Sequence, residues 1–250
     1  SLRIPMLLAA AFTVWLFYRL MRRAVGTWAA LAACALLATD TIFVLTNVLD
    51  WGPVVLQHLL AVLVLWLALR FHETGQRWRL ALAAFCCGLA LWDKAAFAWT
   101  LAGFVVGGTV IFRREMAKAL NWRNALMAGA CLVAGASPLI RANWDNAAEL
   151  IGDAGGLSHP YWKVKLVMAK DTLDGSALLG YLTREDPPLA AAPPAIALDR
   201  ASVALGDTLG HPRRHGLPWA VAAALLLLPF LWRTPARRTM LFSLVAAGTA

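Results

Sequence analysis

The stretch that decides the fold is residues 77–114, which read RWRLALAAFCCGLALWDKAAFAWTLAGFVVGGTVIFRR. Two apolar runs, 80–92 and 95–112, meet at the charged pair Asp93-Lys94, and arginines flank both outer ends. A single helix through this stretch would bury a carboxylate and an ammonium group inside an apolar segment, which is costly in a membrane. Two short helices joined at the charged pair keep both charges at the membrane edge. The sequence therefore predicts a helical hairpin.

Apolar runs separated by short charged connections continue along all 250 residues of the chain. The chain is 60% hydrophobic and only 15% charged, whereas soluble domains have about 25% charged residues. With their flanking residues, eight of the runs approach the roughly 20 residues that a membrane helix needs. They cover residues 4–18, 25–46, 53–69, 80–92, 95–112, 124–140, 217–232 and 239–250. We predict an all-α fold, a polytopic transmembrane helical bundle of about eight helices.

The basic residues alternate between the connections in a way that orients the bundle. The connections after the first, third, fifth and seventh runs each carry three or four Arg or Lys residues, and the short ones between them carry few. Connections rich in Arg and Lys stay on the cytoplasmic side of a membrane. One long helix in place of the hairpin would put the cluster at 113–123 on the wrong side. The four basic connections are therefore predicted to be cytoplasmic.

The longest connection, residues 141–216, has nearly balanced charge and is predicted to be an extracytoplasmic loop with amphipathic helices. We expect three parts: transmembrane helices in 1–140, this loop, and further transmembrane helices in 217–250, the last of them truncated. The net charge of +9 does not indicate nucleic acid, because the cations lie between apolar runs and form no basic helix face. The excess of Arg over Lys and the abundant Ala favour a bacterial inner membrane protein.

Two carboxylates belong to the predicted outer edge, Asp50 just before a helix start and Asp40 deeper along the chain. Asp50 precedes Pro53, a residue that fits the first turn of the next helix. The Asp50 carboxylate either stabilises that positively polarised helix end, or faces a cavity and binds a divalent metal ion or a sugar hydroxyl. The spacing leaves these alternatives open. Asp40 is similar, and local turn bonding with Thr39 and Thr41 is favoured for it over a cavity-facing role.

Two cations lie at the same outer edge, where positive charge is otherwise scarce. Lys94 either forms a self-neutralising pair with Asp93 or binds a phosphate, and its isolation favours the phosphate. Arg141 either binds a phosphate too or extends to the lipid headgroups. His58 is interpreted as a packed histidine with its nitrogens satisfied. His159, in the long loop, is a candidate substrate contact, with a structural role favoured.

Several motifs resemble those of the membrane-embedded C-type glycosyltransferases that use lipid-phosphate sugars. The nearest branch is glycosyltransferase family 39, which includes the protein O-mannosyltransferases and the bacterial aminoarabinose transferases. The resemblance is carried, in order, by Leu2–Pro5, Arg22–Gly26, the connection ending in Asp50, Gly88–Lys94, Ser137–Asn143 and Leu173–Gly175. It covers most of residues 1–185. One departure is the turn at 93–96, which reads Asp-Lys-Ala-Ala where the family usually has Thr-Lys-Gly-Pro.

The resemblance implies an inverting transfer of a sugar from a polyprenyl-phosphate donor to a lipid, glycan or protein acceptor on the extracytoplasmic face. Lys94, with Arg141, would hold the donor phosphate, and Asp50 would position a divalent metal ion or the acceptor. The family's catalytic acid, the general base for the acceptor hydroxyl, is expected upstream of Ser1. On this comparison the chain is expected to lack the first helix and first outer loop.

Two other classes of protein are weighed against the glycosyltransferase. A transporter or lipid flippase of the inner membrane should carry charges near the membrane midplane and break its helices there. In this chain the charges gather at the edges and the interiors of the runs are nearly free of charge. A membrane scaffold without catalysis would leave the outer-edge residues Asp50, Lys94 and Arg141 unexplained. The enzyme is therefore the favoured interpretation, with the transporter as the alternative.

Overall fold

The computed structural model describes residues 3–48, 54–119, 121–144 and 236–249, with isolated positions between 167 and 229. The chain divides into two compact units, Ser1–Ile151 with Leu231–Ala250, and Gly152–Phe230. All the helices described below belong to the first unit. The amphipathic helices predicted for the long loop, the predicted run 217–232 and the Leu173–Gly175 motif lie outside the described residues.

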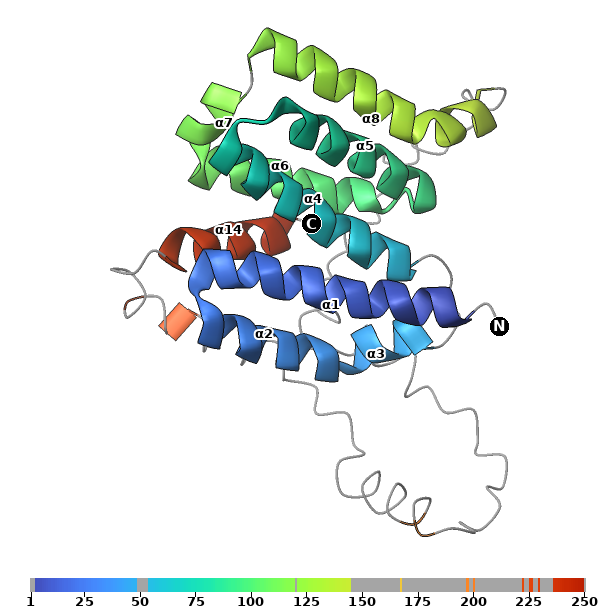
Figure 1. The fold of residues 1–250 in the computed structure, drawn as a ribbon, viewed down its shortest axis with the longest axis vertical. Coiled ribbons are helices and arrows are strands. Elements are labelled where there is room, and N and C mark those ends of the chain that lie inside the picture. Colours follow the sequence, from blue (N-terminus) through green and yellow to red (C-terminus); the bar gives the residue numbers. More distant parts are fainter. Residues whose placement is uncertain are drawn as a thin grey trace. The chain divides into compact units, whose positions relative to one another are not determined.

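Within the described residues the first unit is built of nine α-helices and contains no strand (Figure 1). They are α1 (Arg3–Val25), α2 (Thr27–Thr39), α3 (Thr41–Val48), α4 (Val54–Thr74), α5 (Arg77–Asp93), α6 (Phe97–Ile111), α7 (Arg113–Ala119), α8 (Trp122–Ala142) and α14 (Ala236–Thr249). The fold is therefore a helical bundle, as predicted. Most helices extend a few residues past their apolar runs, because charged residues occupy their terminal turns.

The predicted hairpin is confirmed, because α5 ends at Asp93 and α6 begins at Phe97. Lys94 has an extended backbone, with φ −153° and ψ 116°, which stops the first helix. Its amide donates to the carbonyl of Ala90 at 3.0 Å, and its own carbonyl accepts from the amide of Phe97 at 2.9 Å. The turn is thus closed by backbone hydrogen bonds on both sides of the charged pair.

The single run predicted over 25–46 is wrong, because the structure breaks it at Asp40 into α2 and α3. Asp40 is extended, with φ −65° and ψ 123°, and its carboxylate accepts a hydrogen bond from the amide of Phe43 at 2.7 Å. This contact satisfies an amide that the first turn of α3 leaves unpaired. The run is apolar on both sides of the break, so hydropathy alone does not reveal it.

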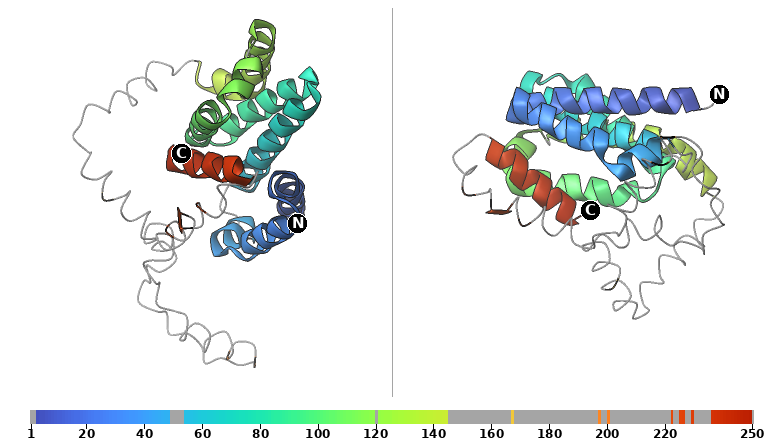
Figure 2. Two further views of the ribbon diagram at one scale, coloured as in Figure 1. Left: turned by 90° about the vertical axis from the view of Figure 1, so that its left-hand side faces the viewer. Right: turned by 90° about the horizontal axis from the view of Figure 1, so that it is seen from below.

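The helices α2, α1, α4, α5 and α8 pack in that order, each against the next (Figure 1). Helix α14 packs against α6, and the turned view shows it beside this row (Figure 2). The core lies where α4, α5 and the start of α6 meet, and Leu67, Ala90 and Phe97 are almost completely buried there. The α5–α6 hairpin is thus anchored in the densest part of the unit.

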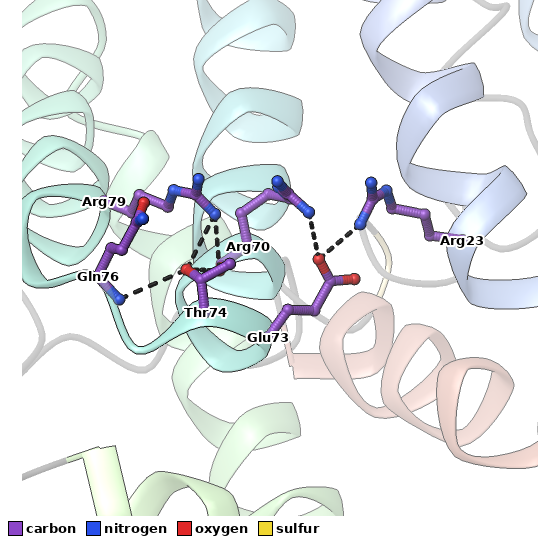
Figure 3. Close-up of polar contacts among 6 residues, drawn as sticks. All are labelled: Arg23, Arg70, Glu73, Thr74, Gln76 and Arg79. Carbon is purple, nitrogen blue, oxygen red and sulfur yellow. Dashed lines mark hydrogen bonds and ion pairs between the residues drawn. The ribbon is translucent and has the colours of Figure 1, made fainter.

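The basic connections meet at one end of the unit, here named the basic end and formed by the close of α1, α4 and α6, the start of α2, α5, α8 and α14, and α7. Arg23 of α1 and Arg70 of α4 both pair with the carboxylate of Glu73, at 2.5 and 2.6 Å (Figure 3). Arg79 of α5 donates to the hydroxyl of Thr74 at 2.9 Å. These contacts confirm that the ends of α1 and α4 and the start of α5 lie together.

The other end of the unit, here named the Lys94 end, is formed by the close of α5 and α8 and the start of α4 and α6. By length and composition, the helical stretches Ile4–Val25, Val54–Thr74 and Trp122–Ala142 can each cross a membrane, and Thr27–Thr39 and Phe97–Ile111 are shorter apolar helices. Large apolar side chains such as Leu8, Leu36 and Val110 are more than half exposed. Such an apolar exterior suits lipid rather than water. The chain is an integral membrane protein.

Candidate functional site

Helices α5 and α8 approach each other so closely at Gly88 and Gly135 that no side chain fits between them. A Cβ atom at Gly88 would lie 2.2 Å from the carbonyl oxygen of Leu132, and one at Gly135 would lie 2.2 Å from that of Phe85. Small residues of this kind allow membrane helices to pack backbone to backbone. This contact fixes the relative height of the two helices.

The glycine contact places Lys94 and Arg141 at the same end and at a similar level. Both helices run from the basic end toward the Lys94 end (Figure 1). Lys94 follows Gly88 by six residues and Arg141 follows Gly135 by six residues. A helix rises 1.5 Å per residue, so each cation lies about 9 Å beyond the contact. The two cations predicted for the site thus lie at a similar height on neighbouring helices.

The side chain of Lys94 is exposed, and none of the ion pairs among the described residues joins it to Asp93. Lys94 and Asp93 thus form no direct ion pair, but their neighbouring charges still interact. Asp93 is half-buried, and its buried Oδ2 atom has no hydrogen-bond partner among the described residues. The tip of the hairpin exposes the ammonium group of Lys94 to a ligand.

Arg141 is exposed in the last turn of α8, where a cation is also favoured by the helix dipole. Two local hydrogen bonds from side chains to backbone carbonyls stabilise this helix end. Pro138 has no amide hydrogen for the carbonyl of Ala134, and the hydroxyl of Ser137 donates to that carbonyl at 2.8 Å instead. The side-chain amide of Asn143 donates to the carbonyl of Leu139 at 2.9 Å. The guanidinium group remains available to solvent or a ligand.

A second group of polar residues lies where α3 meets α4. The ring of His58, on α4, lies 5.4 Å from the ring of Phe43 on α3. Its Nδ1 atom is buried and has no hydrogen-bond partner in the described part of the chain, so the expectation of a satisfied histidine is wrong. Asp40 itself is exposed and caps α3.

An apolar hollow of about 170 Å³ lies between α1, α2 and α3. Leu7, Val14 and Phe43 line it, and Asn47 is the polar residue among the described ones that face it. The amide group of Asn47 donates to the carbonyl of Phe43, while its buried Oδ1 atom has no partner within the described ranges. The hollow therefore combines an apolar wall with one unsatisfied acceptor.

Two of the predicted site residues, Asp50 and His159, lie outside the described residues, so their proposed contacts stay predictions. Among the residues that the structure does describe, no group of three or more His, Cys, Asp or Glu side chains is arranged to hold a metal ion. The metal ion predicted at Asp50 therefore also stays a prediction. Lys94 and Arg141 lie at one end of neighbouring helices, and the roles predicted for them and for Asp40 stay predictions.

Sequence reasoning missed the glycine contact and the buried polar atoms of His58 and Asn47. A signal for the contact exists, because Ala84 and Gly88 on one helix and Cys131 and Gly135 on the other are small residues four apart. Such spacing is common in membrane helices and does not name the partner. The unsatisfied atoms leave no signal in the sequence, because they depend on how neighbouring helices pack.

Comparison with known proteins gives one match. The model of the family described as dolichyl-phosphate-mannose-protein mannosyltransferase matches residues 1–140, which is more than half of the chain and includes α1 to α7 and most of α8. No curated protein and no solved structure matches. The match agrees with the helical membrane fold and with the motifs of the C-type glycosyltransferases. The chain therefore belongs to the dolichyl-phosphate-mannose-protein mannosyltransferase family and is a membrane glycosyltransferase of the mannosyltransferase type.

Proposed function

We propose that this enzyme takes its sugar from a polyprenyl-phosphate donor whose phosphate binds between Lys94 and Arg141. The observation that carries the proposal is the height match of these two exposed cations across the Gly88–Gly135 contact. Lys94 has no ion-pair partner in the described part of the chain, and Arg3 is the one other cation that the described helices place at this end. Binding of an anionic ligand accounts for the presence of Lys94 and Arg141 at this end.

The chemistry needs positive charge at this position. During transfer the bond between the sugar's anomeric carbon and the phosphate oxygen breaks, and that oxygen keeps the electron pair. An acceptor hydroxyl forms the new bond, and its proton passes to a general base. Negative charge therefore grows on the leaving phosphate. Fixed cations that face this charge stabilise the transition state more than the ground state.

The surroundings of the pair fit a lipid-linked donor better than a soluble one. The exposed surfaces of α5, α6 and α8 below the Lys94 end are apolar, with Phe85, Val105 and Val133 all substantially exposed. The hollow beside α3 offers a further apolar surface for an isoprenoid chain. We propose that the acceptor is a lipid, glycan or protein on the extracytoplasmic face of a bacterial inner membrane, because the basic end is the one that the positive-inside rule assigns to the cytoplasm.

The test uses membranes that contain the full-length protein and its native acceptor, with radiolabelled polyprenyl-phosphate mannose as donor. Lys94→Ala and Arg141→Ala are each expected to lower the transfer rate by roughly 10²- to 10³-fold, as loss of one charge-stabilising donor does. Lys94→Arg should keep part of the activity, because the charge remains.

The matched control is Lys118→Ala, which removes an exposed lysine from the basic end. It should leave the rate near that of the wild type. A Lys94→Ala protein that inserts normally and transfers sugar at the wild-type rate would rule out the phosphate role.

A further inference from the structure

A charged cavity lies at the basic end, away from the Lys94 end. It has a volume of about 320 Å³ and is lined by Val110, Ile111, Arg113, Arg114, Glu115 and Arg238. This volume falls at the lower end of the range of about 300–1,000 Å³ that is typical of ligand pockets. Its walls come from α6, α7 and α14, so the cavity exists only when these three helices are assembled.

One wall of this cavity is held in place by several contacts of Arg238. Its Nη2 atom lies 2.7 Å from Oε1 of Glu115 and donates to the carbonyl of Ile111 at 3.0 Å. Its guanidinium carbon lies 4.5 Å from the centre of the Phe112 ring. Arg238 is therefore a fixed structural residue, and its charge is balanced by that of Glu115.

The other two arginines of the cavity are not balanced. Arg113 and Arg114 are exposed, and no described residue forms an ion pair, hydrogen bond or ring contact with either of them. The cavity therefore carries a net charge of two positive units once Glu115 and Arg238 are paired. The positive-inside rule explains why arginines occur at this end. It does not explain why two of them line a cavity that is completed by a helix more than a hundred residues away.

We propose that this cavity binds the phosphate of an anionic phospholipid of the cytoplasmic leaflet, through Arg113 and Arg114. Planar guanidinium groups match the geometry of phosphate oxygens, and basic pockets between membrane helices on the cytoplasmic side bind anionic headgroups. The depth also fits, because the cavity lies where α6 ends and the short helix α7 begins.

The surface next to the cavity favours a phospholipid over a free phosphate compound. Val110, which lines the cavity, is 59% exposed, and Val106, one turn earlier on α6, is also exposed. Acyl chains can lie along this apolar face while the headgroup occupies the cavity. A water-soluble phosphate compound would gain nothing from the face. The site is separate from the proposed donor site, so it can be tested without an assay of sugar transfer.

The experiment measures lipid binding to the purified full-length protein by native mass spectrometry in a neutral detergent. Dioleoylphosphatidylglycerol is the anionic probe, dioleoylphosphatidylcholine the zwitterionic comparison, and glycerol phosphate the soluble competitor. The variant R113Q/R114Q is expected to bind phosphatidylglycerol roughly tenfold more weakly than the wild type, with unchanged binding of phosphatidylcholine. Glycerol phosphate should not compete with the lipid.

The matched control is R77Q/R123Q, which removes two exposed arginines from the same end that do not line the cavity. It should bind phosphatidylglycerol as the wild type does. An equal loss in both double variants would overturn the proposal in favour of diffuse attraction between charges. Equal binding of both lipids by the wild type, or displacement of the lipid by glycerol phosphate, would overturn it as well.

Discussion

At the scale of single residues, Asp40 is a predicted site residue whose carboxylate also has a structural role. Its side chain accepts the amide of Phe43 and so begins α3, which in turn places Phe43 against His58. Local turn bonding, which the sequence favoured for Asp40, is present, but its partner is the amide of Phe43. The expected partner Thr39 donates instead to the carbonyls of Ala35 and Leu36. The predicted contact of Asp40 with a substrate stays a prediction, and the two roles can be separated by experiment.

Asp40→Ala should lower the free energy of unfolding by about 1 kcal/mol, because the first turn of α3 loses its cap. Asp40→Asn should leave stability almost unchanged, since asparagine caps helices about as well as aspartate. Thermal unfolding of both variants in detergent checks this. If the charge of Asp40 also serves the substrate, Asp40→Asn will lower transfer at normal stability. Equal loss of stability in both variants would contradict the capping role.

At the scale of helices, the contact between α5 and α8 determines where the two cations of the site lie. The sequence predicted both helices correctly, because hydropathy is a property of short segments; the roles of Lys94 and Arg141 stay predictions. It did not predict that Gly88 meets Gly135, since pairing between helices depends on the shapes of both surfaces. The break at Asp40 was missed for a related reason. A helix cap inside a uniformly apolar run does not change the mean hydropathy of that run.

Gly88→Ala and Gly135→Ala should each push α5 and α8 apart, because the added methyl group would meet backbone atoms that cannot give way. Destabilisation by roughly 1–3 kcal/mol is expected, as for other overpacked cores. Sugar transfer should fall along with stability, because Lys94 and Arg141 lose their alignment.

Gly129→Ala is the matched control for this pair, since it lies on α8 and a Cβ atom there meets nothing within 4 Å. It should be neutral or stabilising by up to about 1 kcal/mol, as alanine is the better helix former. Thermal unfolding and transfer are measured side by side. A protein with Gly88→Ala that matches Gly129→Ala in both measurements would show that the helices are not in close contact.

Helix α14 is joined to α7 by an ion pair whose strength should depend on pH. The hydrogen bond from Arg238 lowers the pKa of Glu115 below its ordinary value of 4.5. The stabilising contribution is therefore fully present above that ordinary value and is lost as the pH falls through the lowered one. The protection factors of the α14 amides, which correct for the intrinsic effect of pH on exchange, should fall on acidification from pH 7 to about pH 3.

In Glu115→Gln the exchange of α14 should already be faster at pH 7 and should respond less to acid. The ion pair of Arg23 with Glu73 also titrates in acid, so the comparison is made within α14 and not on global unfolding. An acid response in Glu115→Gln as large as that of the wild type would assign the effect to another group.

At the scale of the whole molecule, the alternation of basic connections predicts which end faces the cytoplasm. In a variant with all four cysteines replaced by alanine, Lys118→Cys and Lys94→Cys report on the two ends. A membrane-impermeant maleimide added to intact spheroplasts should label Lys94→Cys, and should label Lys118→Cys only after permeabilisation. The cysteine-free protein gives the background. The reverse pattern would invert the proposed sidedness of the donor site.

The pairing of α14 with α6 also has a consequence for how the chain is made. Arg238 donates to the carbonyl of Ile111, and 127 residues separate them. Translation at roughly 5–20 residues per second leaves a gap of about 6–25 s between these two points. During this time the small-residue face of α6, which later receives Phe242 at Gly107, has no α14 to cover it. A chain whose synthesis stops in this interval therefore has an α6 that lacks its partner helix.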